Sequence, residues 1–145
     1  MNYLENLAKT KNLDAVPDSP DLALNKLASA RKRLADARIV NVSKETRFDA
    51  AYNAIRDLAE IGLLIYGFRT NARGGGHHQM AIQCLKHTLG VDDGRIQVID
   101  GLRKQRHLAD YEGETVNDAA LSECIRQATH LLPEVEDAMK MKGWK

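Results

Sequence analysis

The chain has 145 residues, of which 21 are lysine or arginine and 20 are aspartate or glutamate, so its formal net charge is +1. This balance argues against a protein that coats nucleic acid, and no window reaches the roughly 18 apolar residues of a membrane span. A chain of this length forms one domain and needs no disulfide or metal to bury a core.

The targeting and cysteine patterns favour a reducing compartment. Residues 1–5 show no basic leader followed by an apolar stretch, so we expect a soluble cytoplasmic protein without a membrane partner. Cys84 and Cys124 each lie among apolar residues at helical spacing, which predicts reduced core thiols. No pattern in the chain indicates a cofactor.

Positive charge is concentrated in two stretches, residues 26–38 and 95–107, in each of which several basic residues accompany one acidic residue. Two local patches on a nearly neutral protein favour a local anionic ligand. In the first patch, the run Arg31–Arg33 winds around most of a helical turn and is typical of a solvated edge rather than of a docking surface.

In chain order, helical patterns alternate with short breaks that offer almost nothing for a sheet. Residues 1–20 form an N-terminal segment with a short helix over 2–10, and a second helix is predicted over 21–38. The strongest helix runs from 44 to 68 behind Ser43, a good N-cap. Its apolar stripe widens into a nearly all-round apolar end, which is typical of a central helix buried by several neighbours.

Further helices follow to the end of the chain. Gly62, inside the long helix, indicates the close approach of another helix. Helical patterns are predicted for residues 80–89, for 93–111 and from about 118 onward, where Pro133 should kink or restart the last helix. The fold class is therefore all-α, with residues 21–145 forming a bundle of four to five main helices.

Residues 69–78 form a break with three consecutive glycines. Arg73, His77 and His78 border these glycines, and we predict that the stretch binds a phosphate through positive charge and free N–H groups. It lacks the Lys-Ser/Thr end of a P-loop and a preceding strand, so a mobile loop between helices is the alternative. The adjacent histidines point about 100° apart and cannot share a metal ion, so no metal site is predicted.

The helix over residues 93–111 carries the main candidate site. Five polar residues fall on one side of it, at positions i, i+3, i+4, i+7 and i+8: Arg103, Arg106, His107, Asp110 and Tyr111. An apolar stripe runs beside them: Val98, Ile99, Leu102 and Ala109. Cations, an imidazole, a carboxylate and a phenol at the border of a buried surface suit a phosphate or a reacting group. A solvated helix edge has the same spacing and is the alternative.

Three segments resemble the HEPN superfamily of helical proteins associated with nucleotides and nucleic acids. Residues 47–54 are similar to its second-helix pattern, residues 75–78 to the loop before its next helix, and residues 102–111 to its signature helix. The resemblance covers roughly residues 22–140.

The resemblance implies a homodimer in which the signature helices of two protomers meet at a cleft. Active members are metal-independent ribonucleases, often of toxin–antitoxin or phage-defence systems, and others bind nucleotides or partner with nucleotidyltransferases. The family motif is an arginine, four to six residues and then a histidine, with a polar residue after the arginine. Arg106 matches the arginine and His107 the polar position, but Tyr111 stands where the histidine is expected.

This departure matters for catalysis. RNA cleavage by the neighbouring 2′-hydroxyl needs a group that moves a proton near neutral pH, which histidine, with a reference pKa near 6.5, does better than a phenol near 10. Arg103 and Arg106 would still hold a phosphate, and His107 would replace the missing base. Alternatively, Tyr111 is an interface phenol that forms a hydrogen bond across a dimer.

We therefore predict a HEPN-like dimer that binds RNA or nucleotide phosphate through Arg103, Arg106, Arg73, His77 and His78. If it is a metal-independent ribonuclease, Arg106, His107 and Tyr111 are its catalytic residues. A second hypothesis is a non-catalytic interaction subunit, such as an antitoxin-like protein or a nucleotidyltransferase partner. A third is a structural dimer with an ordinary polar seam.

Overall fold

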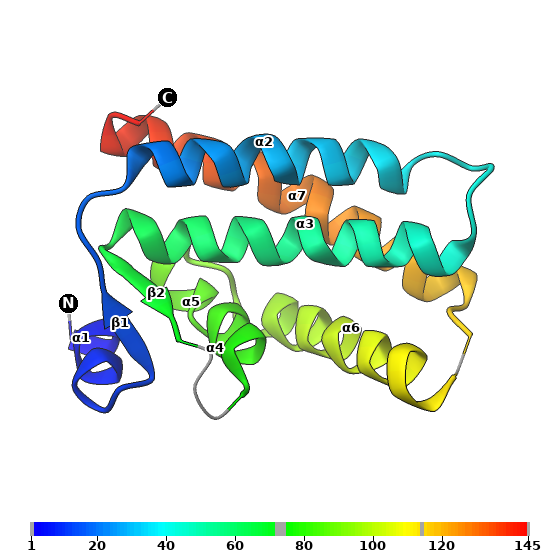
Figure 1. Cartoon of the computed structure of the whole chain (residues 1–145), viewed down its shortest axis with the longest axis horizontal. Helices are drawn as coiled ribbons and strands as arrows, with labels where there is room; N and C mark the ends of the chain where they lie inside the picture. The colour runs from blue at the N-terminus through cyan, green and yellow to red at the C-terminus, as the bar shows by residue number, and fades with distance from the viewer. Residues whose placement is uncertain (1, 72–74, 114, 145) are drawn as a thin grey trace.

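The computed structural model describes residues 2–71, 75–113 and 115–144, and it confirms the predicted all-α fold (Figure 1). The helices, in chain order, are α1 (Asn2–Lys9), α2 (Pro20–Ala37), α3 (Lys44–Ile65), α4 (His77–Gln83), α5 (Leu85–Thr88), α6 (Asp93–Glu112) and α7 (Asp118–Lys142). Two short strands accompany them, β1 (Leu13–Ala15) and β2 (Phe68–Thr70).

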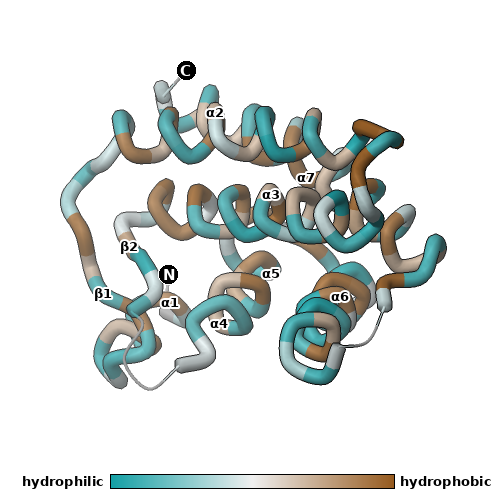
Figure 2. The backbone as a smooth tube through the Cα atoms, turned by 45° about the vertical axis from the view of Figure 1, so that its right-hand side comes forward, coloured by the Kyte–Doolittle hydropathy of each residue, from teal (hydrophilic) through white to brown (hydrophobic). Residues whose placement is uncertain are grey.

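Helix α3 is the centre of the bundle, as its apolar pattern predicts. It packs most extensively against α2 and α7, and α4, α5 and α6 contact it as well (Figure 1). Ser43 is its N-cap and accepts a hydrogen bond from the Thr46 N–H at 3.2 Å. Hydrophobic and hydrophilic segments alternate along α2 and α3 in Figure 2 because each helix turns one side inward.

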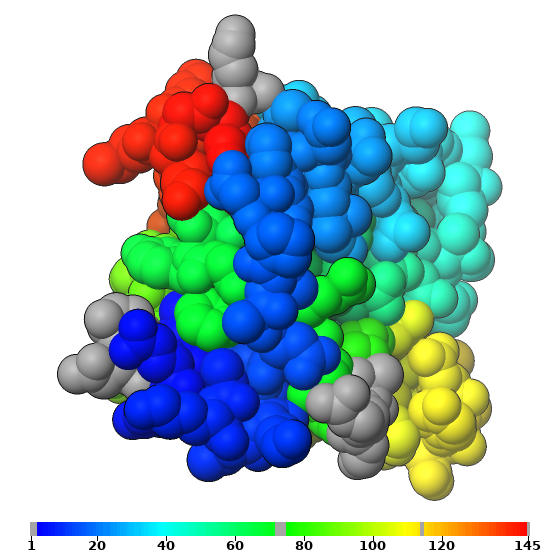
Figure 3. Space-filling view, turned by 60° about the vertical axis from the view of Figure 1, so that its left-hand side comes forward, coloured from blue at the N-terminus to red at the C-terminus, as the bar shows by residue number. Residues whose placement is uncertain are grey.

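The sequence offers almost nothing for a sheet, and the described residues contain a sheet of only two short strands. β1 pairs with β2 in an antiparallel register that places Asp14 opposite Arg69. Helix α3 therefore ends at Ile65 rather than near residue 68, since Phe68–Thr70 extends to pair with the N-terminal segment. In Figure 3 this blue N-terminal segment lies against the green residues that follow α3.

Gly62 allows the close helix approach that its position predicts. A Cβ atom at Gly62 would lie 2.8 Å from the Thr88 Oγ1 atom of α5, closer than packed atoms come. The helix predicted over residues 80–89 is in fact two, α4 and α5, which divide at Cys84. Cys84 is buried and free, as is Cys124 on α7, which confirms the prediction of core thiols.

Asp57 is a charged residue of α3 whose side chain the apolar pattern of the helix does not predict to be buried. The side chain is buried, and burial raises the pKa of its carboxyl despite a hydrogen bond with Ser29 and the nearby Arg33. Arg33 on α2 lies 3.7 Å away, so the pair joins α2 to α3. The α3 surface that α2 covers is therefore wider than its hydrophobic residues alone indicate.

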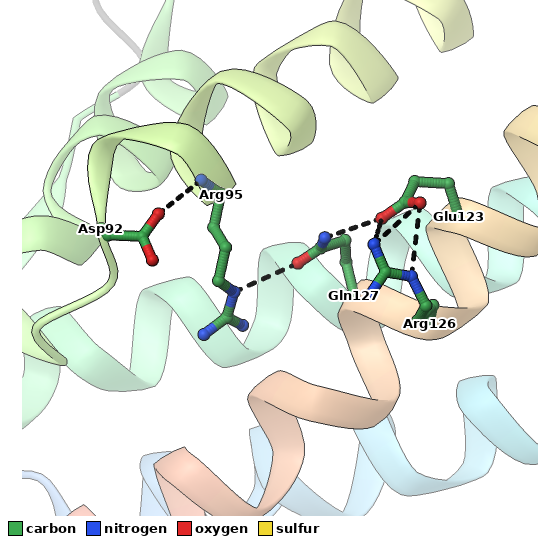
Figure 4. Close-up of polar contacts among 5 residues, drawn as sticks. All are labelled: Asp92, Arg95, Glu123, Arg126 and Gln127. Atoms are coloured by element: carbon green, nitrogen blue, oxygen red, sulfur yellow. Dashed lines mark hydrogen bonds and ion pairs between the residues drawn. The ribbon is translucent and has the colours of Figure 1, made fainter.

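Polar contacts hold the start of α6 against α7. Asp92 caps α6 by accepting a hydrogen bond from the Arg95 N–H at 2.8 Å, and the Arg95 side chain donates to Gln127 Oε1 at 3.3 Å (Figure 4). Gln127 in turn donates to Glu123 at 2.7 Å. Helix α7 begins behind the N-cap Asn117 and does not restart at Pro133, because one helix is continuous over Asp118–Lys142.

Candidate functional site

A hollow of about 220 Å³ opens where α3, α4 and α6 meet. Its lining contains the five polar residues that the helical spacing of α6 groups together, along with residues from α3 and the start of α4. The lining residues are Tyr52, Gly76, His77, His78, Gln79, Arg103, Arg106, His107, Asp110 and Tyr111.

The structure thus brings together every predicted site residue among those it describes. Arg73, which is also predicted to contact phosphate, lies outside the described residues. The apolar stripe beside the α6 polar side was predicted less accurately: Ile99 and Leu102 are buried, whereas Val98 is 40% exposed. The polar side of α6 therefore faces the hollow, and Val98 belongs to its outer side.

Arg106 is held by two carboxylates and an aromatic ring. Its Nε atom donates to Asp49 Oδ1 of α3 at 3.0 Å, and Asp110 Oδ2 lies 4.0 Å from the same atom. The guanidinium carbon lies 5.2 Å from the centroid of the Tyr52 ring, a cation–π distance. These contacts fix the guanidinium through its Nε edge and one face.

Arg103 is held in the same manner. Its Nε atom donates to Asp100 Oδ1 at 2.8 Å, and Asp100 also pairs with Lys104 at 3.6 Å. Within the described residues, no hydrogen bond engages the terminal nitrogens of Arg103 or Arg106. Both guanidinium groups therefore line the hollow with donors left for an anion, in the planar geometry that suits a phosphate.

His78 is a neutral ring. Its Nε2 atom lies 3.2 Å from Arg56 Nη1, and since a guanidinium only donates, Nε2 must accept and the ring proton resides on Nδ1. Burial, reinforced by the charge of Arg56, lowers the pKa of His78 to about 4. His78 can therefore offer a ligand a neutral N–H donor but no positive charge near pH 7.

His77 stands at the start of α4, directly after Gly76 in the left-handed conformation at φ +72°. Its ring meets the His78 ring edge-on at a centroid distance of 4.3 Å. The His77 Nδ1 atom is buried and makes no hydrogen bond within the described part of the chain. The two histidine rings thus form an aromatic wall of the hollow.

Tyr52 belongs to the apolar stripe of α3 and also lines the hollow. It is fully buried beneath Arg106, and its hydroxyl makes no hydrogen bond within the described residues. Burial raises the pKa of this phenol to about 12, against the opposing charge of Arg106. The only sequence signal for this role is a tyrosine within an apolar stripe. The hydroxyl of a buried tyrosine usually needs a hydrogen-bond partner, so such a residue is a candidate for ligand binding.

His107 and Tyr111 form the outer rim. Their rings lie 4.5 Å apart between centroids, one helical turn from each other on α6, and Tyr111 is 75% exposed. This exposed pair adds an aromatic surface to the polar hollow. The site therefore combines guanidinium donors, neutral donors and open aromatic faces.

Within residues 2–71, 75–113 and 115–144, no group of three or more His, Cys, Asp or Glu side chains is placed to hold a metal ion. None of the described helices has the length and apolar character needed to cross a membrane.

No family model matches the chain, and no curated protein matches it in sequence. The geometry of the hollow is therefore the main support for a functional assignment.

Proposed function

We propose that this protein binds the phosphate groups of single-stranded RNA at the hollow between α3, α4 and α6. The observation that carries the proposal is the pair Arg103 and Arg106, whose guanidinium groups are fixed through Nε while their terminal nitrogens remain open. A fixed guanidinium loses little entropy on binding and offers two parallel donors to a phosphate.

Neighbouring groups favour a nucleotide chain over a small isolated anion. Tyr111 and His107 expose aromatic faces at the rim, where unpaired bases of a single strand can stack beside a phosphate held by Arg106. The carboxylate of Asp110 is also at the hollow and repels a purely acidic ligand. A polymer that supplies both phosphate and base contacts fits this mixture best.

We extend the proposal to a homodimer. The outer side of α6 exposes Val98 and Leu108, and between them Gly101 has no atom within 4 Å of the place that a Cβ would take. A helix face with exposed apolar residues and a glycine suits close packing against another helix. Packing of two α6 helices through this face would join two protomers along the helix that the resemblance to the HEPN superfamily assigns to the dimer, with each hollow on the inner side of its own α6.

RNA cleavage is a second candidate function, favoured by the contact between the His107 and Tyr111 rings beside Arg106. His107 would take the proton of a 2′-hydroxyl, whose oxygen attacks phosphorus while the bond to the 5′-oxygen breaks. The leaving 5′-oxygen takes a proton from Tyr111, and the His107 imidazolium returns one to Tyr111. The products are a 2′,3′-cyclic phosphate and a 5′-hydroxyl.

Binding is tested by fluorescence anisotropy with a labelled single-stranded RNA at low salt. We expect Arg106→Ala to weaken binding at least tenfold and to reduce the salt slope, since about 0.7 counterion is released per phosphate contact in single strands. Arg31→Ala is the matched control, because Arg31 of α2 pairs with Glu136 of α7 and does not line the hollow. Binding that falls equally in both variants, or no binding by the wild-type protein, would refute the proposal.

Cleavage is tested by incubating the same RNA with the wild-type protein in the presence of a chelator. Products that end in 2′,3′-cyclic phosphate, and that disappear in His107→Ala and decrease in Tyr111→Phe, would support the second function. RNA that stays intact while it is bound would leave binding as the function and reject cleavage.

A further inference from the structure

The Tyr52 hydroxyl is a polar group without a partner in a position where partners are normally required. Tyr52 is 0% exposed, and neither a side chain nor a backbone group of the described residues forms a hydrogen bond with its hydroxyl. An unpaired buried hydroxyl destabilises a fold relative to a paired one, so native proteins keep few of them. Phenylalanine would fill the same space without this cost.

The surroundings of Tyr52 indicate an anionic partner. The Arg106 guanidinium covers its ring, and Arg103, Arg106 and Arg56 all contribute positive charge at the phenol. Burial nevertheless raises the pKa of the phenol to about 12, so the hydroxyl keeps its proton at physiological pH. A protonated hydroxyl beneath a guanidinium is a donor suited to an anionic oxygen.

Tyr52 lies on the wall that a bound anion would reach. It lines the hollow together with Arg103 and Arg106, and its ring centroid is 6.5 Å from that of His78, which presents a neutral N–H donor. Because the Arg106 guanidinium lies over the Tyr52 ring, an oxygen bound by its terminal nitrogens would lie next to Tyr52. The ligand would then supply the partner that the protein leaves out.

We propose that Tyr52 is a phosphate-positioning residue, whose hydroxyl donates a hydrogen bond to an anionic phosphate oxygen held by Arg106. This inference rests on the proposed binding of RNA phosphate and adds to it a neutral donor from α3. The hydroxyl is closed to solvent in the free chain, and the Arg106 guanidinium covers the ring that carries it, so we expect the phosphate to approach the hydroxyl along this guanidinium. A bound phosphate would therefore contact both α3, through Tyr52, and α6, through Arg106.

The test compares the wild-type protein with Tyr52→Phe, using inorganic phosphate and the single-stranded RNA as probes against chloride at equal ionic strength. We expect Tyr52→Phe to bind both probes about tenfold more weakly, the usual effect of losing one hydrogen bond to a charged group. The free variant should melt at the same or a higher temperature, because an unpaired buried hydroxyl has been removed. A tyrosine with a structural hydrogen bond would instead lose stability.

Tyr66→Phe is the matched control, because Tyr66 is the exposed C-cap of α3 and does not line this hollow. A second measurement follows the tyrosine absorbance: phosphate should shift the absorbance of the wild-type protein, and this shift should be absent in Tyr52→Phe.

Three results would overturn the proposal. Unchanged affinity in Tyr52→Phe, with Arg106→Ala still deficient, rejects the role of Tyr52 and leaves the proposed function standing. A large fall in the melting temperature of Tyr52→Phe shows that the hydroxyl is structural. A wild-type protein that binds neither inorganic phosphate nor RNA rejects both proposals.

Discussion

The two halves of α6 differ in how they use the same residue types. In the first half, Arg95 extends to α7, where it donates to Gln127 at 3.3 Å and to Glu134 at 3.0 Å. In the second half, Arg103 and Arg106 each donate through Nε to an aspartate and keep their terminal nitrogens open toward the hollow. The first half thus anchors α6 to α7, and the second half lines the hollow.

Packing follows the same division. Ile99 is fully buried and Leu102 nearly so, whereas Leu108 and Tyr111 near the end of α6 are exposed. The buried side chains of α6 therefore lie in its first half, and its last turns are exposed to a ligand or a second chain. The contrast shows that an arginine is a functional candidate when its donors are unused, and that charge alone does not make it one.

The largest expected effect is on stability, from truncation in the anchored half. Ile99→Ala should lower the free energy of unfolding by about 3 kcal/mol, because it removes a fully buried side chain and leaves a cavity. Leu108→Ala, the matched change in the second half, should cost less than about 1 kcal/mol at low protein concentration, because its side chain is already exposed. Urea denaturation measures both, and equal losses would show that the two halves are packed alike.

The next effect separates the arginines. Arg95→Ala should lower the free energy of unfolding by about 2 kcal/mol, because it leaves Gln127 and Glu134 without their donor. The folded variant should bind RNA with wild-type affinity, unlike Arg103→Ala, which should weaken binding with little loss of stability. Urea denaturation and fluorescence anisotropy on both variants check this, and the contrast fails if Arg95→Ala weakens RNA binding as much as Arg103→Ala does.

A pH series probes the histidine wall opposite the second half of α6. The folded pKa of His78, at about 4, lies below the unfolded value near 6.5, so unfolding takes up a proton between these values. The contribution of neutral His78 to the free energy of unfolding is fully present above about pH 6.5 and is lost as the pH falls toward 4. At pH 5 the loss is about 1–2 kcal/mol.

The measurement compares urea denaturation of the wild-type protein and His78→Asn at pH 7 and pH 5. The wild-type protein should lose more stability than the variant as the pH falls, because the substituted asparagine has no proton to gain and the other titrating groups are common to both. An equal loss would show that His78 is protonated in the folded chain.

The sequence predicted the polar side of α6 because helical periodicity depends only on local spacing. Arg103, Arg106, His107, Asp110 and Tyr111 line one hollow as their positions on the helix require. The same logic predicted the burial of α3 and the close approach at Gly62. Helical spacing alone can therefore predict which residues of a single helix face the same side.

What sequence reasoning missed depends on contacts between distant segments. Nothing in the local sequence distinguishes Asp49 of α3 from other polar residues, because its hydrogen bond is to Arg106, 57 residues later in the chain. The neutrality of His78 follows from burial and from Arg56 on another helix, neither of which the local sequence shows. The pairing of β1 with β2 likewise joins segments too short to show a strand pattern of their own.

The smallest expected effect tests the outer side of α6. Gly101 lies inside the helix with nothing within 4 Å of an added Cβ, so Gly101→Ala should raise the stability of the isolated chain by up to about 1 kcal/mol through helix propensity. If this face packs against a second copy, the methyl group should also weaken the dimer. Urea denaturation at low concentration measures the first effect, and sedimentation at high concentration measures the second. A variant that is more stable and dimerises as the wild-type protein does would place the dimer seam elsewhere and leave the exposed Val98 and Leu108 without a partner in it.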